Sequence, residues 1–418
     1  MITTDNSLTS FMKAYTEQYP FSGNILVALH GKPVYSQSFG YASVEHDVPI
    51  QEDTKFGIWS ITKSFTAMAV AMLVEDGQLR FDDPVSDYIP SFKAYEQMTI
   101  RYLLQHRSGL PNFTHVAEYN GNMNKWPLQL DQMLALLKDK PLDFTPGDSF
   151  SYNNTGYFVL GLIIEKVSGL SFESFIAARI LKPLGLNDTG VNNGRSVIPN
   201  LASAYSSSGR ELAPAEYIDM STVTTAGGMY ATAADLLQWD QSLYNNRLIS
   251  PELAAQLFDF SEDGYELGWF LDKKQGRRRI SHSGAYRGYR SELHRYPDDG
   301  VTVILLTNYE FVPSTKLAQS LADLMLGEEA SVSEQPPRYS MKPEEFNVLK
   351  GVYEGFGCVA EIGLDTDGYY LIWNKREKHE LYPVSQTEFR HSWHDQSYSF
   401  KQKESGDWSF LGMKKHSL

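Results

Sequence analysis

Strand patterns lie at both ends of one long segment whose middle is helical, and this arrangement restricts the possible folds. The strand-like runs are residues 24–29, 34–41, 278–281, 292–296 and 301–306. The turn His30-Gly31-Lys32-Pro33 separates the first two runs and predicts a hairpin over 23–43. Since helices alone connect the two ends, we expect the distant strands to form one antiparallel sheet with helices packed on it.

Helical patterns fill the section between the strands, with frequent interruptions by Gly and Pro. They are residues 131–138, 156–167, 172–180 and 233–243, and a further helix over 314–326 would close the domain. The sequence therefore predicts an α/β (α+β) fold with an inserted helical subdomain.

The last quarter of the chain has a different pattern. Residues 328–345 lose periodicity and contain Pro336-Pro337, which indicates a linker. Short alternating runs follow at 359–364, 368–373 and 380–384. We expect a first domain over 1–327, the linker, and a small antiparallel, lipocalin-like β-barrel over 346–418.

The charge of the chain limits its partners. The formal net charge is −14 and the pI is near 5.2, which disfavours nucleic acid and anionic membranes. No run approaches the ~18 apolar residues of a membrane span, and the first residues lack a signal-peptide pattern. We therefore expect a cytoplasmic protein, or an extracytoplasmic one from which a signal was removed. The single cysteine, Cys358, rules out an internal disulfide.

A hydroxyl and an amine lie one turn apart at the start of a predicted helix. Ser60 and Lys63 are three residues apart, so their side chains can touch, and Gly77 can end the helix. A serine becomes a nucleophile when a neighbouring base takes its proton, and N–H groups at a helix start can hold an oxyanion. Alone, Ser-x-x-Lys more often marks a capping serine and a solvated lysine. The helix is expected to bury one face, made of Phe65, Ala69, Met72 and Leu73.

A second motif, Tyr152-Asn153-Asn154, lies in a predicted loop before the helical pattern at 156. Beside a lysine cation the phenolate of Tyr152 is favoured, and it can then take the serine proton. Asn154 would hydrogen-bond Lys63 or a substrate amide. The alternative is a tyrosine packed in a turn.

A third motif, Ser281-His282-Ser283-Gly284-Ala285, ends a predicted strand. Gly284 permits close backbone approach, and the N–H groups of Ser60 and Ala285 would be the two oxyanion donors. His282 would hydrogen-bond the substrate or the tyrosine, or else it is an ordinary turn histidine.

The three motifs, in this order and spacing, resemble the serine β-lactamase and penicillin-binding protein superfamily, in its class C-type branch. Residues 103–110 and 225–236 are similar to two further segments of that family, and the resemblance covers about residues 10–330. It implies an α/β domain and a helical domain with the serine at their junction. Residues 346–418 resemble the small barrel that several members append.

The resemblance implies a role for each motif residue. Ser60 would be the acylated nucleophile, Lys63 and Tyr152 would shuttle the proton, and Asn154 would position lysine and substrate. His282 stands where many relatives have lysine, so a fixed cation for a substrate carboxylate is missing there. Arg287 and Arg290 would restore positive charge, or they are ordinary strand-end residues.

The leading hypothesis is a serine hydrolase that acts through an acyl-enzyme on a small ester, amide or peptide. The alternatives are penicillin-binding or β-lactamase-type activity, and a ligand-binding or sensor protein that keeps the fold without catalysis. We expect a small-molecule or peptide substrate, no nucleic acid, no membrane span and no cofactor. No metal site is predicted, since His379, His391 and His394 are scattered among polar residues without metal-ligand spacing.

Overall fold

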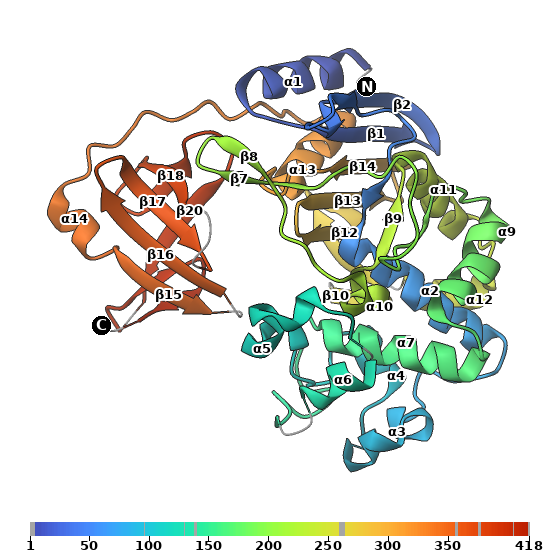
Figure 1. Ribbon diagram of the computed structural model, residues 1–418. Helices are drawn as coiled ribbons and strands as arrows, with labels where there is room; N and C mark the ends of the chain where they lie inside the picture. The colour runs from blue at the N-terminus through green and yellow to red at the C-terminus, as the bar shows by residue number, and fades with distance from the viewer. Residues whose placement is uncertain are drawn as a thin grey trace.

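The computed structural model describes residues 5–95, 97–128, 130–137, 140–258, 264–355, 358–374, 378–403 and 405–416. Among these residues, seven strands form one antiparallel sheet in the order β10-β11-β12-β13-β14-β1-β2 (Figure 1). Their bounds are β1 Gly23–Leu29, β2 Lys32–Phe39, β10 Gly264–Glu266, β11 Trp269–Lys274, β12 Arg277–Tyr286, β13 Tyr289–Tyr296 and β14 Val301–Thr307. The predicted sheet that joins both ends of the segment is confirmed, because β1 pairs directly with β14.

β14 lies in the middle of the sheet and is buried on both faces. Val303 and Leu305 belong to one apolar core, whereas Ile304 and Leu306 belong to the other. This alternation follows from the two-residue period of a strand. An unbroken apolar run is therefore what a central strand of this sheet requires.

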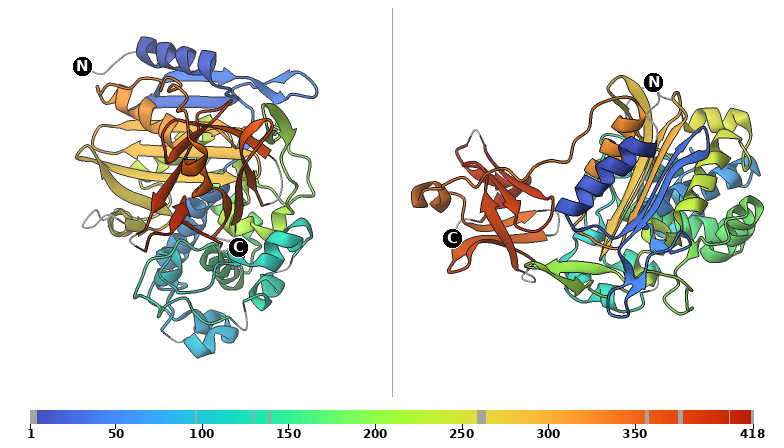
Figure 2. Two further views of the ribbon diagram at one scale, coloured as in Figure 1. Left: turned by 90° about the vertical axis from the view of Figure 1, so that its left-hand side faces the viewer. Right: turned by 90° about the horizontal axis from the view of Figure 1, so that it is seen from above.

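Helices cover both faces of the sheet. α1 (Asp5–Gln18) and α13 (Ser314–Met325) lie on one side, and α2 (Thr62–Glu75) and α11 (Ala233–Tyr244) lie on the other (Figure 2). No helix within the described ranges is long and apolar enough to cross a membrane.

The helix that follows Ser60 is the central element of the molecule. A 3-10 turn over Trp59–Ile61 leads into α2, and every residue of α2 from Thr62 to Leu73 is buried. The expectation of a single buried face was wrong, because a helix placed between the sheet and the helical subdomain is covered all round. Gly77 adopts the left-handed conformation expected after the helix, with φ 69°.

The helical subdomain is inserted between the strands, as expected. Its helices are α3 Val85–Tyr88, α4 Ile100–Leu104, α5 Ala117–Gly121, α6 Leu130–Ala135 and α7 Asn154–Ser168. The pattern over 131–138 extends past Ala135, and residue 138 lies outside the described residues. The pattern over 172–180 begins as α8 (Phe172–Ile176), continues through a π-helical turn over Ala177–Leu181 and ends in α9 (Lys182–Leu184).

The first hairpin has a tighter turn than its sequence suggested. β2 begins at Lys32, so Lys32 and Pro33 belong to the strand and only His30 and Gly31 form the turn. Both turn residues have positive φ, 48° and 73°. Two such residues give the type I′ geometry that matches the twist of paired strands.

The C-terminal domain is a closed antiparallel barrel, which confirms the expected fold. Its strands are β15 Gly351–Gly355, β16 Cys358–Asp365, β17 Gly368–Trp373, β18 Lys378–Pro383, β19 Glu388–His391, β20 Ser397–Gln402, β21 Trp408–Phe410 and β22 Met413–Lys415. The barrel closes where Tyr353 pairs with Lys415. Residues 328–342 contain no helix or strand, and the exact domain boundaries at 327 and 346 stay a prediction.

The barrel is docked on the face of the first domain that carries α1 and α13. Gln396 Nε2 donates to the Phe311 carbonyl at 2.9 Å, and Lys316 Nζ pairs with Asp395 at 2.9 Å. Gly209 N donates to the Lys378 carbonyl at 3.0 Å. These contacts join the rim of the barrel to the sheet domain.

Candidate active site

Ser60 and Lys63 are in direct contact at the start of α2. Lys63 Nζ lies 3.0 Å from Ser60 Oγ, 2.8 Å from Asn154 Oδ1 and 2.8 Å from the carbonyl oxygen of Ala226. The residue before the serine, Trp59, has φ 45°, a left-handed conformation that is unusual for a bulky side chain. The turn therefore presents Ser60 at the junction between the sheet and the helical subdomain.

The amine of Lys63 is completely buried, and this burial lowers its pKa well below the usual value. A neutral amine has two N–H groups and one lone pair. Asn154 Oδ1 and the Ala226 carbonyl are acceptors, so they take the two N–H groups. The lone pair then faces Ser60 Oγ, which is the arrangement that a general base requires.

Tyr152 lies beside Ser60 and Lys63. Its side chain is a neutral phenol rather than the expected phenolate. Its hydroxyl is hydrogen-bonded to Ser60, and Lys63 Nζ lies 4.9 Å from the centre of its ring. Burial raises the pKa of Tyr152 above its ordinary value. The predicted phenolate was therefore wrong, because a dry pocket penalises the charged form and a neutral amine offers no compensating charge. Tyr152 is a neutral phenol and can act as a proton donor.

His106 holds the loop that carries Tyr152. Asn153 N donates to His106 Nδ1 at 3.0 Å, and Ser151 N donates to the His106 carbonyl at 2.9 Å. The rings of His106 and Tyr152 are 4.3 Å apart. Sequence reasoning had noted the segment 103–110 but assigned no role to His106, since its partners lie more than forty residues away.

His282 forms part of the wall of the site, behind Tyr152. Its Nδ1 lies 2.6 Å from the Ser283 carbonyl, so Nδ1 carries the proton, and Nε2 accepts from the Tyr265 hydroxyl at 2.9 Å. Burial lowers the pKa of His282 to about 3. Both ring nitrogens are bonded to groups other than Tyr152, and the expected hydrogen bond from His282 to substrate stays a prediction. Tyr265 was missed, since no motif marks it.

Gly284 and Ala285 bring strand β12 against the serine turn. A Cβ atom on Gly284 would overlap the carbonyl oxygen of Ile58, and Ser291 Oγ donates to that same oxygen at 2.8 Å. Ser60 and Ala285 line one cavity of about 60 Å³. The close approach of β12 thus explains why glycine occupies position 284.

The cavity beside Ser60 is mainly apolar and aromatic. Its other lining residues are Trp59, Phe113, Thr114, Tyr119, Asn154, Val223, Ala226, Gly227 and Tyr286. Arg287 is paired with Glu216, which also binds Lys125 Nζ at 2.9 Å. Burial lowers the pKa of Arg290. Arg287 is therefore engaged in an ion pair rather than free, within a group of two cations and one carboxylate.

The comparisons with known proteins agree with this geometry. The family model described as beta-lactamase matches residues 8–325. The chain belongs to the beta-lactamase family and resembles the penicillin-binding, class C-like serine hydrolases within it.

One curated relative is similar along nearly the whole chain. It is penicillin-binding protein 4* of Bacillus subtilis (strain 168), 30% identical over 412 residues, which covers 91% of this chain and 90% of that protein. The similarity therefore extends beyond the catalytic domain into the barrel.

Two solved structures have the same fold. The octameric penicillin-binding protein homologue from Pyrococcus abyssi has a TM-score of 0.68 and 26% identity, over 98% of this chain and 99% of that one. The D-amino acid amidase from Ochrobactrum anthropi SV3, complexed with D-phenylalanine, has a TM-score of 0.68 and 23% identity, over 77% of this chain and 97% of that one. The first supports both domains, and the second supports the fold of the first domain.

Proposed function

We propose that this protein is a serine hydrolase that forms an acyl-enzyme on Ser60 with a small ester, amide or peptide. The observation that carries the proposal is the buried amine of Lys63, whose Nζ lies 3.0 Å from Ser60 Oγ and is held by Asn154 Oδ1 and the Ala226 carbonyl, each at 2.8 Å. A nucleophile beside a fixed, neutral base is the arrangement that covalent catalysis requires.

The proposed steps use only these groups. Lys63 Nζ takes the proton of Ser60 as Oγ attacks the carbonyl carbon, and the N–H groups of Ser60 and Ala285 stabilise the oxyanion. Tyr152 donates its proton to the leaving alcohol or amine and regains one from Lys63, so the acyl-enzyme forms with no net proton change. Water then attacks the ester bond with Lys63 or Tyr152 as base, releases the acid and restores Ser60.

The surroundings of Ser60 favour an uncharged, apolar acyl donor. His282 is neutral and fully hydrogen-bonded, and Arg287 is paired with Glu216. A substrate carboxylate would therefore meet no fixed free cation from these residues, while the aromatic lining favours an apolar group. An ester or amide without a free carboxylate beside the scissile bond fits this site best.

Ser60→Ala tests the proposal directly. Hydrolysis of a p-nitrophenyl ester should be abolished, and intact mass should show no adduct with a fluorophosphonate, whereas the wild-type chain gains one adduct. Ser64→Ala is the matched control, because Ser64 lies one turn further along the same helix and its Oγ bonds the Ile61 carbonyl. Unchanged turnover in Ser60→Ala would refute the assignment.

A second candidate function is penicillin binding or β-lactam hydrolysis. The 30% identity to a protein named penicillin-binding protein 4* supports it. Fluorescent penicillin separates the possibilities: stable labelling at Ser60 indicates penicillin binding, and rapid nitrocefin turnover indicates β-lactamase activity. If the chain reacts with none of the four reagents, penicillin, nitrocefin, the p-nitrophenyl ester and the fluorophosphonate, it would be a non-catalytic binding or sensor protein.

A further inference from the structure

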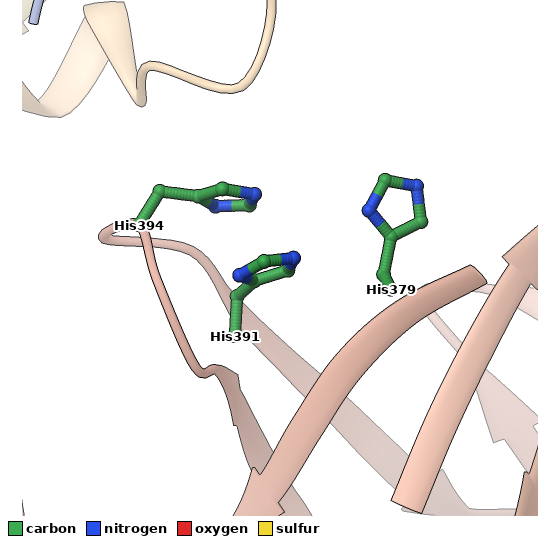
Figure 3. A group of neighbouring side chains, drawn as sticks. All are labelled: His379, His391 and His394. Carbon is green, nitrogen blue, oxygen red and sulfur yellow. The ribbon is translucent and has the colours of Figure 1, made fainter. Parts of the chain in front are cut away.

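Three histidines that are scattered in the sequence meet at the rim of the barrel. His379 lies on β18, His391 ends β19, and His394 lies in the turn before β20. Figure 3 shows the three rings grouped together, with His391 and His394 stacked and His379 facing them. One ring nitrogen from each lies within 4.8 Å of those from the other two.

The cluster is enclosed where the barrel meets the sheet domain. His391 and His394 are each only 2% exposed. The ring of Phe311 covers His394 at 4.8 Å, and Ser207 Oγ lies 3.4 Å from His394 Nε2. Phe311 and Ser207 belong to the first domain, so His394 is enclosed by residues of both domains, whereas His379 is only partly buried.

Two of the imidazoles have a buried ring nitrogen without a hydrogen-bond partner among the described residues. These atoms are His391 Nε2 and His394 Nδ1. Buried polar atoms of this kind normally have a partner, and the neutral imidazole is the form that binds metal ions.

We propose that His379, His391 and His394 form a binding site for a divalent transition-metal ion, with water as a fourth ligand. Three imidazoles suit zinc, nickel and copper ions, and Zn²⁺ readily accepts three histidines in a tetrahedral site. A tetrahedral ion about 2.0–2.1 Å from each nitrogen sets the ligand nitrogens about 3.4 Å apart. Because His391 and His394 are stacked nearly parallel, at an interplanar angle of 18°, their rings must turn for the lone pairs to converge on one ion.

The largest adjustment concerns His391. Its Nδ1 accepts the Trp393 N–H at 3.0 Å, so the ring proton lies on Nε2. Coordination through Nε2 requires the ring proton to move to Nδ1, which then can no longer accept the Trp393 N–H, so the turn at 392–394 must release that hydrogen bond. Metal binding is therefore coupled to the turn that also carries His394, and through Phe311 to the docking of the barrel.

The ion would lie close to one charged pair. Arg210, on the turn between β7 (Tyr205–Ser208) and β8 (Glu211–Pro214), pairs with Glu380 at 3.2 Å, and Ser392 Oγ donates to the same carboxylate. Glu380 follows His379 directly on β18. The positive charge of the metal ion would thus lie near the carboxylate of Glu380 as well as the guanidinium of Arg210. This proposal is independent of the function assigned to Ser60.

The test is metal binding by the full chain, purified without a histidine tag and treated with a chelator. We expect Zn²⁺ to bind with one ion per chain in titration calorimetry, and Co²⁺ to give the visible absorption of a tetrahedral site. His379→Gln and His391→Gln should each weaken Zn²⁺ binding about tenfold or more, a loss of about 1.4 kcal/mol or more by the standard conversion.

Two controls separate the cluster from other sites. His416→Gln, at an exposed histidine of the same barrel, and Ser60→Ala should both bind Zn²⁺ like the wild type. If the variants at the cluster unfold, X-ray absorption of the wild-type zinc complex still counts the imidazole ligands, and three are expected. The proposal is overturned if the wild type binds no Zn²⁺ or Co²⁺ at micromolar concentrations, if it binds without imidazole ligands, or if the folded cluster variants bind as tightly as the wild type.

Discussion

His282 in the first domain and His391 and His394 of the barrel are all buried, but their ring nitrogens differ in hydrogen bonding. In the catalytic domain, His282 donates from Nδ1 to the Ser283 carbonyl and accepts at Nε2 from Tyr265. In the barrel, His391 Nε2 and His394 Nδ1 have no partner among the described residues. Burial lowers the pKa of all three rings. Burial thus decides the charge, while hydrogen bonding decides whether a ring nitrogen is available.

A related rule applies to Lys63 in the first domain. Burial lowers the pKa of its amine and so favours the neutral form, and Asn154 Oδ1 and the Ala226 carbonyl accept two of its N–H groups. The remaining lone pair is available to Ser60. The two regions therefore differ in the proposed use of their buried nitrogen atoms. We propose proton transfer for Lys63 and metal coordination for His391 and His394.

The largest expected effect is at Lys63. Lys63→Ala removes the base, so kcat/KM for a p-nitrophenyl ester should fall by about 10²–10⁴-fold. Lys55→Met is the matched control, because Lys55 is also buried but pairs with Asp188 at 2.9 Å. Its loss should reduce stability and leave kcat within a few-fold. Equal activity losses in the two variants would show that Lys63 has only a structural role.

A smaller effect is expected when His282 loses its hydrogen bond from Tyr265. Tyr265→Phe removes the partner of His282 Nε2, which makes His282 resemble His391. We expect the free energy of unfolding to fall by about 1–3 kcal/mol, the usual cost of an unsatisfied buried polar group. Urea unfolding measures this, with Tyr217→Phe as the control at an exposed position.

A further effect is expected in the pH dependence of stability. The pKa of His391 is about 3 in the folded chain, whereas an unfolded histidine titrates near 6.5. Between about pH 6.5 and 3 the unfolded chain therefore binds more protons, so stability falls as the pH is lowered through this window.

His391→Gln should reduce that slope by about one proton, measured by urea unfolding between about pH 4 and 7. His416→Gln, at an exposed histidine, should leave the slope unchanged. A slope that does not differ between wild type and His391→Gln would show that His391 is protonated in the folded chain, and its proposed role as a ligand would then lose its support.

The sequence alone was sufficient for the architecture and for the order of the site motifs. Ser60 and Lys63 are neighbours because helix geometry places residues three apart on the same side, a local rule that needs no tertiary information. The apolar run of β14 and the alternating runs of the barrel are local patterns too. In the first hairpin the error concerned the residue at which β2 begins. In α2 it concerned how much of the helix is buried, which depends on the elements packed around it.

Only the tertiary structure decided the chemistry of the buried groups. The pKa directions of Lys63 and Tyr152 depend on how completely other elements cover them, and the phenolate expected from the sequence was wrong for that reason. His282 and Tyr265 are bonded across two strands of the sheet. His379, His391 and His394 lack metal-ligand spacing in the sequence and meet because the antiparallel pairing of β18 with β19, and the turn that follows β19, bring them together. Local periodicity determines the elements, whereas desolvation and long-range contact determine what their side chains can do.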